Sequence, residues 1–321
     1  MRSVVCTLFE GSYHYGVAAL ANSLASAGYR GDLVAGYRGA LPSWAQDAKP
    51  AGNRWSEDSR ALSLPEGPRV VFVPLATAVH FSNFKPDFML ELLSGPAADA
   101  DAIFYIDPDI CVERRWCDFE QWVAYGVALC EDVNSPLAQH HPRRMAWREY
   151  FAKFGLSLNY AIPEYVNAGF IGMRRQDEDF LKLWSRMMEF VALELGSMSS
   201  TKVSGGAAFA SKGPLNCFDC SDQDALNAAL EASEATASVV GAEAMGFKSG
   251  LVWLPHAVGG DKPWDRNYLR MALGGVPPRR VDKSYWSHAL GPIAAHSRSV
   301  RWQKVTSLRL GALIGRFVRR S

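Results

Sequence analysis

The chain has 321 residues, of which 48% are hydrophobic and 21% charged, a composition typical of one large globular α/β domain or of two domains. Lysine and arginine total 34 against 33 acidic residues, so the net charge of +1 does not indicate a polyanionic partner such as nucleic acid. No signal peptide opens the chain and no uncharged apolar run is long enough to span a membrane, so we expect a cytoplasmic protein.

The N-terminal part predicts a β-loop-α-β unit. Residues 4–8 form a short apolar run typical of a strand, residues 15–27 are rich in Ala and Leu and predict a helix, and residues 33–37 resume a strand. This order is typical of α/β folds that bind nucleotides. The stretch contains neither Gly-x-Gly-x-x-Gly nor a Walker sequence, which argues against a dinucleotide or P-loop site.

A predicted buried strand at 103–106 runs directly into Asp107-Pro-Asp109. Ligands of open α/β sheets bind at the carboxyl ends of the strands. Two carboxylates this close repel each other unless a cation lies between them, and oxygen ligands suit Mg²⁺ or Mn²⁺. The pattern therefore predicts a metal-diphosphate site, although Asp-Pro-Asp is equally good turn chemistry.

Two stretches on either side of this strand could contact the same ligand. Phe84-Lys85-Pro86 precedes a predicted helix at 87–93, and Lys85 could reach the same phosphates or simply be solvated. Residues 165–173 predict a strand in which Ala168 and Gly169 would let the backbone approach a ligand closely. Asn167 could then hydrogen-bond that ligand; the alternative is a glycine-bearing strand under a helix.

Further along, a Ser- and Gly-rich stretch at 196–214 predicts a mobile loop or lid. Ser221-Asp222-Gln223-Asp224 opens a predicted helix, and helix capping alone would explain its acidic residues. A predicted strand at 251–254 is followed by His256, two glycines and Lys262. This pattern suits a third metal ligand and a phosphate-binding loop, although a lone histidine is more often not a ligand.

The C-terminal segment 298–321 has seven basic residues and no acidic one, with apolar residues interspersed. Such a segment suits the surface of an anionic membrane. An ordinary C-terminal helix packed on the domain is an equally good interpretation.

Taken in order, five stretches resemble glycosyltransferase family 8, the group that contains glycogenin and bacterial lipopolysaccharide galactosyl- and glucosyltransferases. The resemblance covers residues 3–270 and is given by Phe84-Lys85-Pro86, Asp107-Pro108-Asp109, Asn167-Ala168-Gly169, Asp222-Gln223-Asp224-Ala225-Leu226-Asn227 and His256-x-x-Gly259-x-x-Lys262-Pro263-Trp264. It implies a GT-A fold over residues 1–297, with a Rossmann-like, mainly parallel central sheet flanked by helices, and leaves 298–321 as a basic tail.

The resemblance also implies a role for individual residues. Asp107, Asp109 and His256 would hold Mn²⁺ or Mg²⁺, and Asp222 and Gln223 would stand beside the reacting carbon. Lys262 and Gly259 would hold the diphosphate, and Asn167 and Ala168 would line the sugar pocket. The remaining donor-binding positions would be Thr7, Leu8, Glu10, Tyr13, Lys85, Ile106 and Pro108, with Tyr13 stacking on the base.

The function that follows is transfer of a hexose, with retention of configuration, from a nucleotide-diphosphate sugar, usually UDP-linked, to a glycan or lipid-linked saccharide. The partners would be this donor and a saccharide acceptor, in lipopolysaccharide or polysaccharide biosynthesis, with no nucleic acid. Two alternatives stay open at this point. One is a metal-dependent phosphohydrolase, and the other is a non-catalytic nucleotide- or sugar-binding protein on the same fold.

Overall fold

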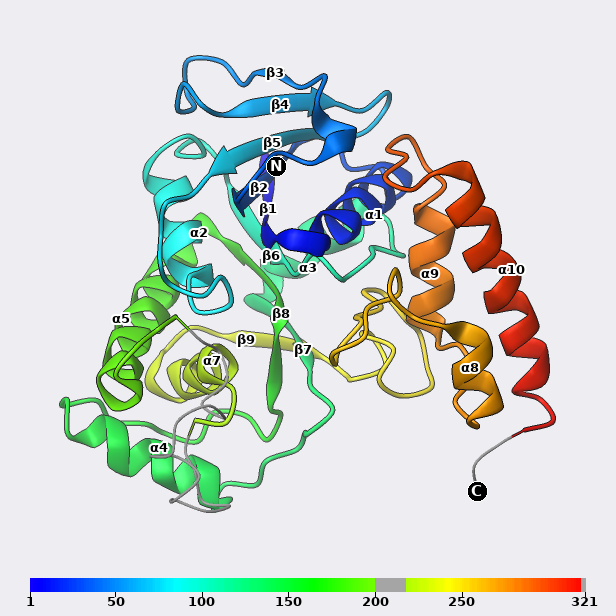
Figure 1. Cartoon of the computed structure of the whole chain (residues 1–321). Coiled ribbons are helices and arrows are strands. Elements are labelled where there is room, and N and C mark those ends of the chain that lie inside the picture. The colour runs from blue at the N-terminus through cyan, green and yellow to red at the C-terminus, as the bar shows by residue number, and fades with distance from the viewer. Residues whose placement is uncertain (200–217, 319–321) are drawn as a thin grey trace. The chain divides into compact units, whose positions relative to one another are not determined.

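A computed structural model describes residues 1–199 and 218–318 of the chain, whose elements are drawn in Figure 1. The chain divides into two compact units, each made of several segments. Unit 1 comprises Met1–Leu8, Leu75–Tyr105 and Phe119–Ala242, and unit 2 comprises Phe9–Pro74, Ile106–Asp118 and Glu243–Ser321. Most of the stretch 196–214, predicted to be a loop or lid, lies outside the described residues.

The strands of unit 1 follow one another in the order β1-β6-β8-β7-β9. Strand β1 pairs with β6 and β7 with β9 in parallel, whereas β7 and β8 are antiparallel. Every residue of β6 is buried, as its uninterrupted apolar sequence predicts. The bounds are β1 (Ser3–Glu10), β6 (Ala102–Ile106), β7 (Val127–Glu131), β8 (Val166–Arg174) and β9 (Ala237–Val240).

In unit 1, helix α7 contacts both α5 and α4, and α2 packs against α5 (Figure 1). Helix α5 buries a stripe of large apolar side chains at helical spacing and ends at Gly196 in the left-handed conformation. The elements are α2 (Lys85–Ser94), α3 (Trp116–Trp122), η3 (Val123–Tyr125), α4 (Pro142–Ala152), η4 (Arg175–Asp177), α5 (Glu178–Leu195) and α7 (Ser221–Ala232).

Unit 2 has its strands in the order β3-β4-β5-β2, with β2 and β5 parallel and the other two pairs antiparallel. Both units therefore combine helices with strands, and the α/β class predicted from the sequence is confirmed. The elements are η1 (Gly11–Tyr13), α1 (His14–Ser26), β2 (Asp32–Arg38), η2 (Ser43–Ala45), β3 (Lys49–Pro50), β4 (Arg60–Ser63), β5 (Arg69–Pro74), α8 (Tyr268–Leu273), α9 (Arg280–His288) and α10 (Arg298–Ile314).

The C-terminal helix α10 packs against α8 and α9 around an aromatic core (Figure 1). Leu308 belongs to that core, and Gly311 lies so close to α8 that an added Cβ would be 2.8 Å from the Tyr268 carbonyl oxygen. Within the core, the Trp286 indole N–H donates to the Tyr268 hydroxyl at 2.8 Å. The described part of the basic segment is thus a packed helix, one of its two predicted alternatives.

One local prediction is wrong. Residues 251–254, predicted as a strand, form an irregular segment in which Trp253 and Leu254 both donate backbone hydrogen bonds to the Ala244 carbonyl. These hydrogen bonds replace a regular strand ladder, which the local preference of the apolar residues does not reveal. None of the described helices is both long enough and apolar enough to cross a membrane.

Candidate functional site

The Asp-Pro-Asp stretch forms a turn immediately after β6. The backbone N–H of Ile110 donates to the carbonyl of Asp107 at 3.1 Å. The first turn of α1 closes tightly on this loop, because an added Cβ on Gly16 would lie 2.1 Å from the Pro108 carbonyl oxygen. The turn predicted from sequence is therefore present, and its backbone is held by a glycine at a close approach.

A short irregular pairing brings His256 to this turn. Ile110 and His256 form an antiparallel bridge, and the backbone N–H of Ala257 donates to the Asp109 carbonyl at 3.1 Å. The pairing continues beyond the bridge, where the N–H of Cys111 donates to the Pro255 carbonyl at 3.3 Å. Two segments almost 150 residues apart in sequence are thus joined by backbone hydrogen bonds, and the side chain of His256 is directed to the carboxylates.

Asp107, Asp109 and His256 form one cluster in unit 2, with one ligand atom from each within 4.8 Å of the others. The imidazole Nε2 lies 3.3 Å from an oxygen of Asp109 and 3.9 Å from one of Asp107. Asp109 and His256 are buried. Two carboxylates and one imidazole suit Mn²⁺ or Mg²⁺. The group can therefore hold a divalent cation, as the sequence predicts.

Lys262 lies beside the same cluster. Its Nζ donates to Asp109 at 2.7 Å and to the Ala257 carbonyl at 2.8 Å, and it lies 5.5 Å from the centre of the Tyr13 ring. Burial lowers the pKa of Lys262, but Asp109 and Tyr13 together raise it by more, so the ammonium form is favoured. Burial raises the pKa of Asp109, yet His256 and Lys262 outweigh that effect and hold it well below its usual range.

The loop between His256 and Lys262 requires glycine. Gly259 has φ of +97°, a conformation that side-chain-bearing residues rarely adopt, and no atom lies within 4 Å of where its Cβ would be. Its open backbone and the neighbouring ammonium group make a suitable anion-binding loop.

A second group of predicted residues comes together in unit 1, around the start of α7. Lys85 and Asp222 form a buried ion pair at 2.9 Å, and Lys85 also donates to the Ala168 carbonyl at 3.0 Å. The side-chain oxygen of Gln223 accepts a hydrogen bond from the Ala168 N–H at 3.2 Å. These contacts tie α2, β8 and α7 to one another, and they join residues that the sequence assigns to donor binding and catalysis.

Asn167 is held on both sides of its amide. Its Nδ2 donates to Asp132 at 2.7 Å and its Oδ1 accepts from the Gly169 N–H at 2.9 Å. The orientation of the amide is thereby fixed. No feature of the sequence marked Asp132 as its partner, since a carboxylate just after a strand also reads as an ordinary turn residue.

The remaining predicted donor residues are mostly buried. Thr7, Leu8, Ile106 and Pro108 are inaccessible to solvent or nearly so, and the Thr7 hydroxyl has no hydrogen-bond partner among the described residues. Glu10 instead forms an ion pair with Arg38 at 3.0 Å. Tyr13 is in edge-to-face contact with Trp264, at 5.7 Å between ring centres. The roles of these residues in donor binding stay predictions.

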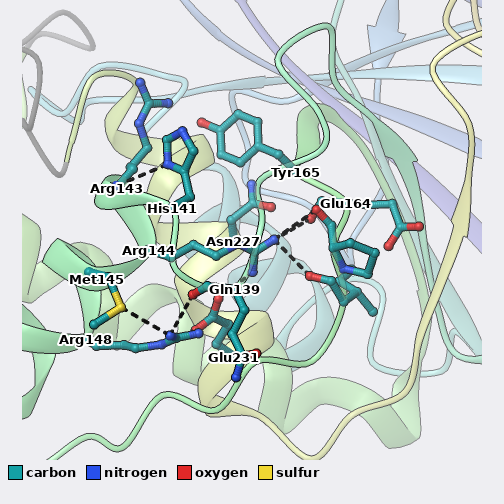
Figure 2. A network of polar contacts seen from close by, with 12 residues as sticks. Gln139, His141, Arg143, Arg144, Met145, Arg148, Glu164, Tyr165, Asn227 and Glu231 are labelled. Carbon is teal, nitrogen blue, oxygen red and sulfur yellow. Dashed lines mark hydrogen bonds and ion pairs between the residues drawn. The ribbon is translucent and has the colours of Figure 1, made fainter.

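A network of arginines from α4 contacts acidic side chains of α7 (Figure 2). Arg144 and Arg148 of α4 both pair with Glu231, and Arg144 also donates to three successive carbonyls ahead of β8. Arg143 lies 3.5 Å from Asp224, which accepts a hydrogen bond from the Tyr165 hydroxyl at 2.8 Å. Because Asp224 immediately follows Gln223, this network also positions the predicted catalytic residues.

The pKa of the buried Asp224 carboxyl differs strongly from its ordinary value. Burial raises its pKa to about 7, although Arg143 and the hydrogen bond from the Cys220 N–H favour the charged form. The pKa of its partner Tyr165 is raised as well, mainly by burial and to a smaller extent by the charge of Asp224. Nothing in the sequence distinguishes Asp224 from a helix-capping acid, because its burial depends on contacts with α4 and β8.

No protein-family model and no curated protein matches this sequence. Solved structures of glycosyltransferases do resemble it. The apo form of the bifunctional glycosyltransferase WbbM has a TM-score of 0.49 and 12% identity, over 96% of this chain and 52% of that one. The chain therefore spans about half the length of WbbM.

Two further structures were found. Galactosyltransferase LgtC in complex with donor and acceptor sugar analogs has a TM-score of 0.44 and 16% identity, over 82% of this chain and 90% of that one. GlyE of Streptococcus pneumoniae TIGR4 has a TM-score of 0.47 and 15% identity, over 95% and 63%. With TM-scores below 0.5, these likenesses establish no function, so the functional argument below is built on the geometry of the side chains.

Proposed function

We propose that the chain is a metal-dependent, retaining glycosyltransferase with a GT-A domain over residues 1–297. It would transfer a hexose from a UDP-linked sugar to a hydroxyl of a glycan or lipid-linked saccharide, as in lipopolysaccharide or polysaccharide synthesis. The observation that carries the proposal is the cluster of Asp107, Asp109 and His256 with Lys262 beside it.

The cluster and its lysine suit the departure of a diphosphate. Asp107, Asp109 and His256 would hold Mn²⁺, which when bound offsets the negative charge of the phosphates. Lys262 would donate to phosphate oxygens, since its ammonium group is held in place by Asp109 and Ala257. A preset cation of this kind contributes most when charge develops in the transition state, on the order of 10²- to 10³-fold in rate.

We assign the sugar to the residues around the start of α7. Asn167 and Ala168 would contact its hydroxyl groups, and Lys85 would keep the Asp222 carboxylate in position. An amide is a poor nucleophile, so Gln223 would orient the sugar or stabilise positive charge while the acceptor hydroxyl attacks on the face that the diphosphate leaves. Retention of configuration follows from attack on that face.

The replacement Asp109→Asn tests the proposal most directly. It keeps the size of the side chain but removes the charge needed for the metal, so we expect release of UDP from UDP-glucose and UDP-galactose to fall by at least about 10²-fold. In parallel, Mn²⁺ with UDP should raise the melting temperature of the wild type and not that of the variant. Circular dichroism would show whether the variant is folded.

A matched control is Asp58→Asn, which changes an exposed carboxylate of the same unit and should leave both measurements unchanged. Wild-type turnover by the Asp109 variant in the presence of a chelator would refute the metal-dependent mechanism. Release of phosphate from a simple phosphate ester, without sugar transfer, would favour a phosphohydrolase. Binding of UDP-sugars with no turnover would indicate a non-catalytic binding protein.

The proposal includes peripheral association of residues 298–321 with the inner, cytoplasmic face of an anionic membrane. Within its described part, basic residues such as Arg309 and Arg316 occur beside exposed apolar ones, of which Phe317 is 82% exposed and Leu313 51%. We expect the chain to co-sediment with vesicles containing phosphatidylglycerol, and Phe317→Ala to weaken this binding. Equal binding to neutral vesicles would contradict an electrostatic attachment.

A further inference from the structure

A cavity of about 430 Å³ lies in unit 2, between α10 and the segment that enters α8, which run side by side in Figure 1. Its volume falls within the range of roughly 300–1,000 Å³ typical of small-molecule sites. None of its lining residues belongs to the metal cluster, to the glycine loop or to the group around α7. The cavity is thus a feature that the proposed transfer reaction does not use.

One side of the cavity is formed by an exposed indole. Trp302 lines it, and its side chain is 73% exposed, although tryptophan is highly buried on average. Leu310, two turns further along α10, also lines the cavity and is 47% exposed. A flat aromatic face that stays largely in water suits a ligand with an apolar face of its own.

The other lining residues are rich in hydrogen-bonding groups. Asp265, Asn267, Gln303 and Thr306 all line the cavity, and together they offer carboxylate, amide and hydroxyl groups. Asn267 is held in place because its Oδ1 accepts from the Arg270 N–H at the start of α8, at 3.1 Å. Such a set can both donate to and accept from a ligand that carries several hydroxyl groups.

The charges of the cavity disfavour an anionic ligand. Of the basic residues that line it, Arg266 is paired with Asp282, and Lys304 donates to the Arg266 carbonyl at 2.8 Å. The Asp265 carboxylate lies in the same lining and acts electrostatically on Lys304. The charge of Arg266 is offset by Asp282 and that of Lys304 is opposed by Asp265, so the lining offers little excess positive charge to a phosphate group, whereas a neutral ligand needs none.

We propose that this cavity is a carbohydrate-binding subsite, which takes a short neutral stretch of glycan with the face of a pyranose ring stacked on Trp302. Pyranose rings present C–H groups on one face and hydroxyls around the edge, so they match an indole beside amide and hydroxyl side chains. The inference goes beyond the proposed transfer reaction, because the subsite would bind saccharide whether or not the metal cluster is active.

Binding of defined oligosaccharides by the full chain tests the subsite. Maltotriose, cellotriose and lactose would serve as probes in saturation-transfer NMR and calorimetric titration. We expect at least one to bind at millimolar concentration, and Trp302→Ala to weaken it by about tenfold or more. Tyr125→Ala is the matched control, since Tyr125 is also aromatic, is as exposed as Trp302 at 73% and does not line the cavity, and it should bind as the wild type does.

Two further arms separate the subsite from other functions. Asp109→Asn should retain saccharide binding even if it loses turnover, so failure of the transfer reaction would leave this result intact. The subsite is refuted if no probe binds the wild type, or if Trp302→Ala binds as tightly as the wild type. Loss of vesicle binding in Trp302→Ala without any saccharide binding would instead assign the indole to a membrane surface, which also overturns the proposal.

Discussion

The region around α7 in unit 1 and the Asp107–Asp109 region in unit 2 both contain buried carboxylates, but the partners of these carboxylates differ. Around α7 in unit 1, Asp222, Asp224 and Glu231 each have a lysine or arginine within 3.5 Å. In unit 2, Asp107 and Asp109 approach the same imidazole, and Lys262 donates to Asp109 at 2.7 Å. The carboxylates around α7 are each paired with a basic side chain, whereas Asp107 and Asp109 lie together beside one histidine.

The difference indicates that some buried carboxylates stabilise the fold, whereas others are arranged to bind a cation. A buried carboxylate with its own arginine acts as a structural joint, and removing either partner leaves an uncompensated charge. Two carboxylates that share an imidazole suit a divalent cation, because a cation between them offsets their repulsion. We therefore expect changes in the arginine network between α4 and α7 to affect mainly stability, and changes at Asp107, Asp109 or His256 to affect mainly metal-dependent behaviour.

The largest stability effect is expected at Glu231. The change Glu231→Ala leaves buried Arg144 without its carboxylate, and we expect a loss of about 3–5 kcal/mol in the free energy of unfolding, measured with urea. Glu178→Ala removes the partly exposed pair with Lys182 in the same unit and should cost less than about 1 kcal/mol. Similar losses in both variants would show that the arginine network is not a structural joint.

A smaller loss of stability is expected at Gly16, where a side chain must displace the Asp-Pro-Asp turn. Its new Cβ would lie 2.1 Å from the Pro108 carbonyl oxygen, so we expect Gly16→Ala to destabilise the protein by about 1–3 kcal/mol. Stabilisation by Mn²⁺ should weaken as well, because the proposed ligands Asp107 and Asp109 flank that carbonyl.

Gly260→Ala is the control for stability, since no atom lies within 4 Å of its added Cβ. The prediction is contradicted if Gly16→Ala is as stable as the wild type and is stabilised equally by Mn²⁺. The turn would then accommodate the added methyl group without cost.

At Asp224 we expect a change in the pH dependence of stability rather than a loss at one fixed pH. Its pKa is raised from 3.8 to about 7 in the folded chain, so the folded state binds this proton more tightly than the unfolded state. The resulting stabilisation is full below the unfolded pKa and is lost as the pH rises through about 7. Asp224→Asn should lose less stability than the wild type between about pH 5 and about pH 8 in urea titrations.

The control for this pH effect is Asp219→Asn, which removes a carboxylate that is mostly exposed and also faces Arg143, at 3.4 Å. It should follow the wild-type pH profile. If Asp224→Asn followed that profile too, burial would not govern the titration of Asp224.

The sequence by itself determined the α/β class, several helices and the residue types of the Asp107–Asp109–His256 cluster. These features depend on local properties: the Ala- and Leu-rich run of α1, the uninterrupted apolar run of β6 and the Asp-Pro-Asp turn after it. The resemblance to a known family added His256 as a partner for the aspartates, and the cluster has that composition.

Only the tertiary structure decided which acidic residues are paired and which can accept a cation. Asp222 and Asp224 look alike in sequence, yet one is held by Lys85 and the other is buried beside Arg143 and Tyr165 with a raised pKa. The bridge between Ile110 and His256 likewise follows residues 251–254, where local preference indicates a strand that does not form. Burial and charge pairing arise from residues far apart in the chain, so no local pattern encodes them.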